Sequence, residues 1–270
     1  KINYIYQNKD FYLTFTPSVF EDTKKLGHLR HEYLMPLTVE KNIIYNEKYG
    51  VLDFEGNLKL RNYDTNKQTN FLINNFNWRS KKWLNSSGIE TYFESLVKNV
   101  NYTAKKTDDF KNDEDNHELH SVLGYFAKLP FFKEDLINSN FYSLTPKILL
   151  RYAPGNMRKV TSGKLKYGNL FSINKINEAD VVEPGLNTSI GFEFIKSKLN
   201  NLKSVGDEIV SFSVGQVISK KENMDIPSST SLDQKFSDIV GESKYNISNK
   251  ANINYNFAID QGYKHFNYNE

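Results

Sequence analysis

The chain of 270 residues contains no cysteine, which excludes disulfide frameworks and thiolate metal sites. It also lacks any continuous apolar run near about 18 residues, which excludes a transmembrane helix. These absences are compatible with a transmembrane β-barrel, because barrel strands alternate lipid-facing and lumen-facing residues and average to a soluble-looking hydropathy. The lysines and the few arginines form no dense cluster, so no nucleic-acid partner is expected.

Aromatic residues are abundant, with 17 Tyr and 19 Phe, and this argues against a largely disordered chain. No linker rich in proline, glycine or serine divides the sequence, so residues 1–270 are expected to form a single domain with no second one. The chain starts at Lys1 without a visible signal peptide and ends at Glu270 in an alternating segment. We therefore expect a piece of a longer protein.

A period of two residues is the main structural signal. Between residues 52 and 61, Leu52, Phe54, Leu58 and Leu60 share one strand face and polar side chains occupy the other. Residues 245–260 alternate in the same way between apolar and amide side chains. In a membrane barrel the two faces meet different surroundings. We expect the following to face the lumen: Lys250, Asn252, Asn254 and Asn256. We expect the following to face lipid: Ile253, Tyr255, Phe257 and Ile259.

Similar segments recur along the chain and predict about eleven strands. They are expected at 11–20, 32–46, 49–63, 68–78, 89–103, 118–128, 141–153, 187–196, 208–219, 245–259 and 263–268. Many exceed the roughly 5–6 residues usual in soluble sheets and reach the 9–11 that cross a bilayer. The predicted fold is all-β, an antiparallel meander of about 10–12 long strands forming a partial transmembrane β-barrel, a fragment of a larger one. An amphipathic helix at 92–100 is the alternative for one segment, and a strand is favoured there.

Candidate chemistry is sparse. His117 and His120 do not have the H-E-x-x-H spacing, and in a strand they would point to opposite faces, so no metal site is expected. Asp53 and Glu55 fit a polar row better than an acid/base pair. No nucleophile or nucleotide-binding motif is present, so neither an enzyme nor a cofactor is expected. Pro36, Pro146 and Pro184 fall in or beside predicted strands, where a strand start, bulge or loop edge is favoured over a weakened seam.

Several strings resemble one known family. They are YDTNKQTNFLINNFNW (63–78), SLVKNVNY (95–102), LTPKILLRYAPGNMR (144–158), NLFSINKINEADVVEPG (169–185), VGQVISKKEN (214–223) and SSTSLDQKFSDIVG (228–241). Together they resemble LptD, the organic-solvent-tolerance or OstA family of lipopolysaccharide-assembly proteins. The resemblance extends over about residues 11–267 and is strongest over 144–241.

This resemblance implies a large barrel in the outer membrane of a Gram-negative bacterium, which inserts lipopolysaccharide into the outer leaflet. It also implies an LptE-like plug lipoprotein and an LptA-like periplasmic bridge as partners. The sequence matches neither the family's periplasmic domain nor its first and last barrel strands, so we expect the central part of the C-terminal barrel domain. Alternatives are another outer-membrane barrel, such as a porin or receptor, and a soluble all-β glycan-binding protein.

Overall fold

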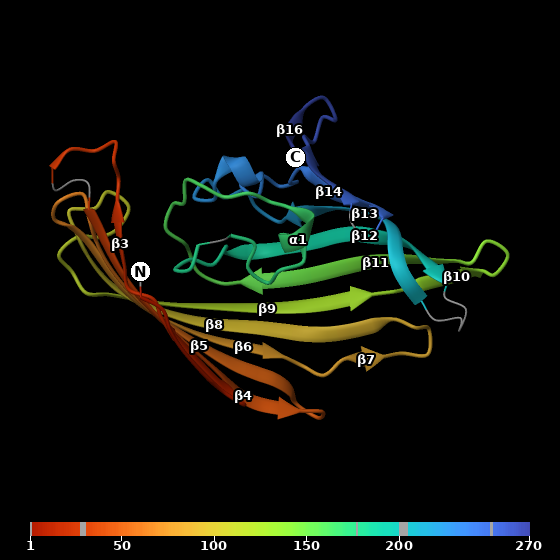
Figure 1. Ribbon diagram of the computed structural model, residues 1–270, viewed down its shortest axis with the longest axis horizontal. Helices are drawn as coiled ribbons and strands as arrows, with labels where there is room; N and C mark the ends of the chain where they lie inside the picture. Colours follow the sequence, from red (N-terminus) through yellow and green to blue (C-terminus); the bar gives the residue numbers. More distant parts are fainter. Residues whose placement is uncertain (1, 28–30, 177, 200–204, 249–250) are drawn as a thin grey trace. The chain divides into compact units, whose positions relative to one another are not determined.

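The computed structural model describes residues 2–27, 31–176, 178–199, 205–248 and 251–270. It is almost entirely β, as predicted, with 16 strands in one antiparallel sheet (Figure 1). The order of paired strands is β1-β2-β4-β5-β6-β8-β9-β11-β12-β13-β14-β15-β16, while β3, β7 and β10 pair with β4, β8 and β11. Among the described residues no pairing joins β1 to β16, so the meander is open.

The strand bounds confirm the predicted long strands. Six strands have 14 to 16 residues: β4 (His31–Asn46), β5 (Gly50–Tyr63), β8 (Glu90–Lys105), β11 (Asn140–Ala153), β12 (Gly185–Leu199) and β13 (Val205–Ser219). Two more have 13 residues, β6 (Lys67–Arg79) and β9 (Asn116–Lys128). The others are β1 (Tyr4–Asn8), β2 (Phe11–Phe15), β3 (Ser18–Glu21), β7 (Trp83–Leu84), β10 (Phe131–Asp135), β14 (Ile239–Ser248), β15 (Ala251–Ile259) and β16 (Phe266–Asn269).

The helical segments whose bounds the structure gives are short, namely α1 (Tyr167–Leu170) and the 3-10 turn η2 (Ser228–Thr230). Neither is long or apolar enough to cross a membrane. Residues 92–100 lie within β8, so the strand prediction for that segment is confirmed and the helical alternative is wrong.

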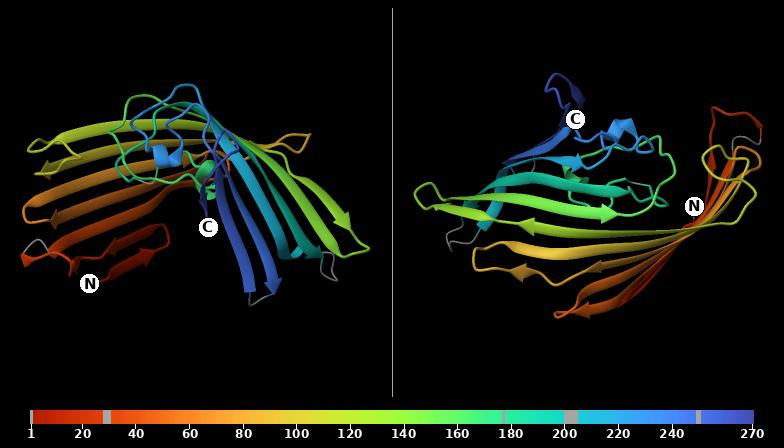
Figure 2. Two further views of the ribbon diagram at one scale, coloured as in Figure 1. Left: turned by 90° about the horizontal axis from the view of Figure 1, so that it is seen from above. Right: turned by 180° about the vertical axis from the view of Figure 1, so that it is seen from behind.

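The chain divides into two compact units, and each is described by itself. Unit 1 comprises Lys1–Lys81 and Glu94–Val122, and unit 2 comprises Lys82–Phe93 and Leu123–Glu270. In unit 1 the aromatic ring of Phe110 packs on Phe71 and Tyr102, beside buried Ile73 and Val100. In unit 2 the long strands β11 to β15 lie side by side (Figure 2).

Two of the predicted strands each correspond to two shorter strands in the structure. Residues 11–20 form two strands, β2 and β3, which pair with different parts of β4. Residues 245–259 were predicted as one strand, but they belong to two strands, β14 and β15, which pair with each other. Tyr245 pairs with Ile253, and both positions are odd-numbered. The alternation therefore keeps its phase from one strand into the next, and the hairpin is invisible to a period-2 analysis.

The prolines lie where a neighbouring strand is interrupted. Pro36 in β4 lies between the segments that pair with β2 and β3, and its carbonyl accepts a hydrogen bond from the Thr16 amide (3.2 Å). Pro146 in β11 lies between the segments that pair with β9 and β10, and its carbonyl accepts from the Leu129 amide (3.1 Å). A missing N–H costs little at such breaks. Pro36 and Pro146 thus lie inside strands, paired on one side with Lys59 and Phe192, whereas Pro184 directly precedes β12, at the strand start that was one of the predicted placements.

Candidate functional site

The sheet of unit 2 has one exposed apolar face and one covered face. On β11, Leu144, Ile148, Leu150 and Tyr152 are 41–54% exposed, although all are large and apolar. On the opposite face of the strand, Thr145, Leu149, Arg151 and Ala153 are buried and Lys147 is half-buried. The polarity is thus opposite to that of an ordinary soluble sheet, which buries its most apolar face.

Cross-strand register places the predicted site residues of β15 on these two faces. Ile253, Tyr255, Phe257 and Ile259 pair with Tyr245, Ser243, Gly241 and Ile239. The rings of Phe192, Phe212 and Phe257 follow one another with centroid distances of 6.1 and 6.4 Å. Phe257 itself is buried, with only 9% of its surface exposed, because its ring lies over Gly241. Phe192 and Phe212 belong to the exposed face. Asn252, Asn254 and Asn256 pair with Asn246, Lys244 and Glu242, on the opposite face. Lys250 lies outside the described residues.

Two connecting segments cover the second face. We call residues 154–184 segment A and residues 220–238 segment B. Their buried apolar side chains form one cluster with a residue from each of β13, β14 and β15: Met157, Val160, Leu165, Tyr167, Leu170, Ile176 and Val181 of segment A, Ile226 and Leu232 of segment B, and Val217, Val240 and Ala258 of the strands. Both segments therefore pack on the face that carries Asn254 and Asn256, and not on the exposed aromatic face.

Helix α1 in segment A approaches the sheet through two paired glycines. Gly191 of β12 and Gly215 of β13 are directly opposite each other. A Cβ at Gly215 would collide with Leu170, and one at Gly191 would come within 3.3 Å of the Phe171 ring. Leu170 is completely buried as a result. The absence of side chains at these two positions allows the helix to rest directly on the strand backbones.

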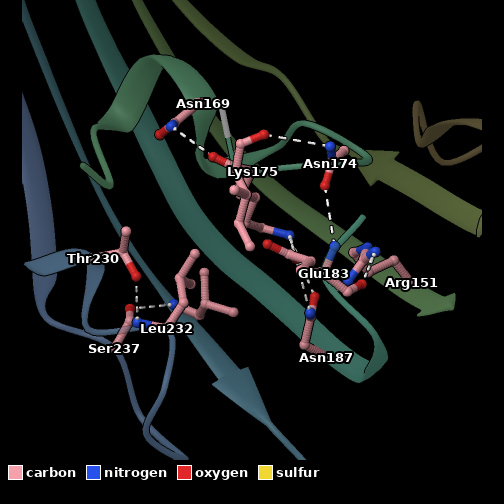
Figure 3. Close-up of polar contacts among 11 residues, drawn as sticks. Arg151, Asn169, Asn174, Lys175, Glu183, Asn187, Thr230, Leu232 and Ser237 are labelled. Carbon is pink, nitrogen blue, oxygen red and sulfur yellow. Dashed lines mark hydrogen bonds and ion pairs between the residues drawn. The ribbon is translucent and has the colours of Figure 1, made fainter. Parts of the chain in front are cut away.

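A fully buried ionic cluster fixes segment A to β11 and β12 (Figure 3). The Arg151 guanidinium donates to Glu183 Oε1 (2.8 Å) and to the Glu183 carbonyl (2.7 Å). The Lys175 ammonium donates to Glu183 Oε1 (3.2 Å) and to Asn187 Oδ1 (3.3 Å). The side chains of Arg151, Lys175 and Glu183 are at most 2% exposed. Two cations thus share one carboxylate, and the cluster carries a net positive charge.

The burial of this cluster shifts its titration. Burial lowers the pKa of the Lys175 ammonium to about 8, against the opposing attraction of Glu183. Burial alone would raise the pKa of the Glu183 carboxyl, but Lys175 and Arg151 hold it below its usual range. The carboxylate is therefore ionised at neutral pH and provides the centre around which both cations are arranged.

Amide and hydroxyl side chains complete the attachment of both segments (Figure 3). Asn174 donates to the Val181 carbonyl (3.0 Å) and accepts from the Glu183 amide (3.3 Å). In segment B, the Ser237 hydroxyl accepts from the Val217 amide of β13 (2.9 Å) and donates to the Asp238 carbonyl (2.8 Å). Asn174 thus satisfies backbone groups within segment A, and Ser237 links the β13 backbone to segment B; these buried groups would otherwise lack partners.

A cavity of about 500 Å³ lies where segments A and B meet the ends of β11, β12 and β13. Its walls include Glu183 and Asn187 from the ionic cluster, and Lys220 and Lys221 from segment B. This arrangement can bind and position polar groups, and it contains no nucleophile paired with a base.

The remaining candidates from the sequence belong to unit 1. His117 Nδ1 is 2.7 Å from Asn101 Oδ1, while buried His120 contacts Glu118, so the two rings diverge as predicted. Within the described ranges no three His, Asp or Glu side chains converge to hold a metal ion. Glu55 accepts hydrogen bonds from the amides of Asn57 and Asn75, which places it in a polar row.

Sequence reasoning missed Arg151, Lys175, Glu183 and Asn187. A signal was present, because Arg151 interrupts the apolar run Ile148–Leu150 close to the end of a predicted strand. A buried charge in such a place requires a partner. The partners lie 24 to 36 residues later, in and just after the string 169–185, which carried part of the family resemblance.

The family model described as "LptD: LPS transport system D" matches residues 42–270, which is most of the chain. A search of curated proteins finds no match.

Proposed function

The chain belongs to the LptD family of the lipopolysaccharide transport system, and from this premise we propose that it is a part of an outer-membrane barrel wall that inserts lipopolysaccharide into the outer leaflet. The observation that carries the proposal is the exposed apolar face of the unit 2 sheet. Its most aromatic face is exposed, while its other face, which mixes polar side chains such as Arg151 and Asn187 with apolar ones such as Leu149 and Val217, is covered by segments of the same chain. Exposure of this kind is stable in hydrocarbon and costly in water.

The exposed face is proposed to contact lipid. Tyr152, Phe192, Phe212 and Tyr255 lie on it, and all are at least 36% exposed. We assign Ile253, Phe257 and Ile259 to the same lipid-facing surface by their register. Closed hydrogen-bonded strands would satisfy every backbone group within the membrane, where no water is available to do so.

The covered face is proposed to line the lumen. Asn252, Asn254 and Asn256 would then point inward, with Lys244 and Glu242 beside them. Amide and charged side chains bind sugar hydroxyls and phosphates reversibly, which suits a conduit that breaks no covalent bond. Segments A and B would act as a fixed inner lining of this part of the lumen, held by the Arg151–Glu183 pair.

The partners follow from the family. We propose that an LptA-like bridge delivers lipopolysaccharide from the periplasm and that an LptE-like lipoprotein plugs the barrel. Long connections such as segments A and B and residues 106–115 leave the strands at one end, and in outer-membrane barrels the long loops are extracellular. The short connections at the other end would face the periplasm.

The test uses the full-length parent protein in its own cells. Its product is depleted, newly made lipopolysaccharide is pulse-labelled, and arrival at the cell surface is scored. Assembly of an unrelated outer-membrane barrel is followed in parallel. Stalled lipopolysaccharide with normal assembly of the control barrel is the expected result. Normal arrival of lipopolysaccharide would reject the proposal and favour a porin or receptor barrel.

A further inference from the structure

A ladder of amide side chains interrupts the apolar face of unit 1. On β5 this face carries Phe54, Leu58 and Leu60, which pair with Phe76, Leu72 and Asn70 of β6. Leu72 and Phe76 are 45% and 40% exposed, as on a lipid-facing surface. On β8, however, the same face carries Asn99, Asn101 and Thr103 at the end of the strand, above exposed Val97.

These polar side chains are linked to one another. Asn70 donates to Thr103 Oγ1 (3.3 Å) and Asn74 donates to Asn99 Oδ1 (3.4 Å). Asn101 donates to Asn99 Oδ1 (2.6 Å) and contacts His117 Nδ1 through its own oxygen (2.7 Å). The network keeps the amides in fixed positions while they stay only partly buried, so they form a preorganised polar surface.

The upper end of the ladder opens into a groove. A cavity of about 410 Å³ lies between Gln68, Asn70 and Thr103 on the strands and Asp113, Glu114 and Asp115 on the following loop. The loop is tied down, because the Asp113 amide donates to the Ala104 carbonyl at the end of β8 (2.9 Å). In the part of the chain that the structure describes, Gln68 Oε1 and Asn74 Oδ1 have no hydrogen-bond donor.

The chemistry of the groove selects a hydroxyl-rich ligand. Each amide offers both donors and an acceptor, and each carboxylate offers acceptors, while a sugar hydroxyl is a donor and an acceptor at once. An apolar ligand would leave these groups unsatisfied, and an anionic one would meet three carboxylates against a single cation, Lys105, in the groove lining. The groove also lies at the strand end that bears the long 106–115 loop, directly above the exposed apolar residues.

We infer that the amide ladder and its groove bind the sugars of glycolipid headgroups from outside the barrel wall. This second site is separate from the lumen, and it rests on the proposed function only for the orientation that places the long loops outward. It would hold the neutral oligosaccharide part of a headgroup beside the wall, with the acyl chains against Leu72, Phe76 and Val97 below.

The experiment titrates the purified full-length protein in detergent with a neutral oligosaccharide, which is released from lipopolysaccharide by mild acid hydrolysis and then freed of phosphates and acidic sugars. Saturation-transfer NMR reports the affinity. The variant Asn99→Ala/Asn101→Ala removes two central amides, and Ser95→Ala, on the same face of β8 outside the groove, is the matched control. A third variant, Asp113→Asn/Glu114→Gln/Asp115→Asn, changes only the exposed loop and keeps the strand pair intact.

We expect about a tenfold weaker affinity for the double amide variant, from the loss of a few hydrogen bonds, and a several-fold loss for the loop variant. Ser95→Ala should bind as the parent does. If intact lipopolysaccharide in phospholipid nanodiscs competes with the oligosaccharide for binding, the natural ligand is the glycolipid headgroup rather than a free oligosaccharide. No binding of the oligosaccharide by the parent protein, or equal binding by all variants, would overturn the inference. This titration measures binding and not transport. Its result is therefore independent of the depletion assay, so the proposed function and the binding of sugars can fail separately.

Discussion

Leu170 of α1 lies directly against Gly215 of β13, with no room between them for a Cβ atom. This contact joins an irregular segment to the most regular part of unit 2. It also defines a test of how tightly segment A is held, because a side chain at position 215 would collide with Leu170 of the helix as well as with the β12 backbone at Ile190.

Gly215→Val is therefore expected to loosen segment A and to destabilise unit 2 by about 1–3 kcal/mol, the usual cost of overpacking. Limited trypsin digestion of the purified protein, followed at Lys164, Lys166 and Lys175, should show faster cleavage. The matched control is Gly168→Ala, because a Cβ there would meet no atom within 4 Å. Equal protection of both variants would show that the Leu170 contact does not hold the segment.

The ionic cluster predicts an unequal response to the removal of its members. Glu183→Gln leaves the two buried cations Arg151 and Lys175 without an anion, and a loss of about 3–5 kcal/mol in the free energy of unfolding is expected. Arg151→Met leaves one balanced pair, so its loss should be smaller. Denaturant unfolding of the purified variants measures both values.

A partly exposed ion pair in the same segment provides the control. Arg158 pairs with Asp180 at 2.5 Å, and its side chain is 22% exposed. Arg158→Gln should cost at most about 1 kcal/mol, as exposed pairs do. An equal loss in the free energy of unfolding for Arg158→Gln and Glu183→Gln would contradict the inference that burial of the Arg151–Glu183 pair makes the cluster important for stability.

Lys175 predicts a pH dependence at alkaline pH. Its pKa is about 8 in the folded protein and 10.5 as the unperturbed value, so the unfolded chain binds more protons between these limits. The free energy of unfolding should therefore rise with pH over this window, by up to about 3 kcal/mol, as the penalty for burying the charge disappears. Lys175→Met should lack this rise. Denaturant unfolding of the parent protein and of Lys175→Met is measured at pH 8 and at pH 10. The same increase in the free energy of unfolding for both proteins would contradict the assignment to Lys175.

The regular strands could be predicted from sequence because each has an apolar and a polar face. In β5, Leu52 and Phe54 alternate with Asp53 and Glu55, and the structure keeps that division. The alternation does not show where the chain turns back if the residues paired across the hairpin are both odd-numbered or both even-numbered, because apolar and polar residues then keep alternating in the same phase through the turn. Tyr245 and Ile253 are such a pair, so the β14–β15 hairpin was not found.

Segments A and B could not be predicted as a covering layer. Their burial depends on contacts between residues far apart in the chain, such as the Ser229 hydroxyl with the Gly163 carbonyl (2.9 Å). Neither segment has a sequence period, and both contain polar strings typical of exposed loops. The family resemblance marked these strings as important, and the structure supplies the reason for Asn174 and Ser237, whose side chains satisfy buried backbone groups.

The assignment of faces on β15 predicts a contrast between two adjacent residues. Tyr255 pairs with Ser243 on the exposed aromatic face, and Asn254 pairs with Lys244 on the opposite one. If the aromatic face contacts lipid, Tyr255→Arg places a charge in hydrocarbon at a cost of about 2–4 kcal/mol near the membrane midplane, whereas Asn254→Arg places it in a wet lumen. The level of folded, heat-modifiable protein in the outer membrane should fall for Tyr255→Arg and stay near that of the parent for Asn254→Arg. Equal levels for the two variants would reject the assignment. A loss confined to Asn254→Arg would reverse it, and the covered face with its segments A and B would then be the side that contacts the membrane.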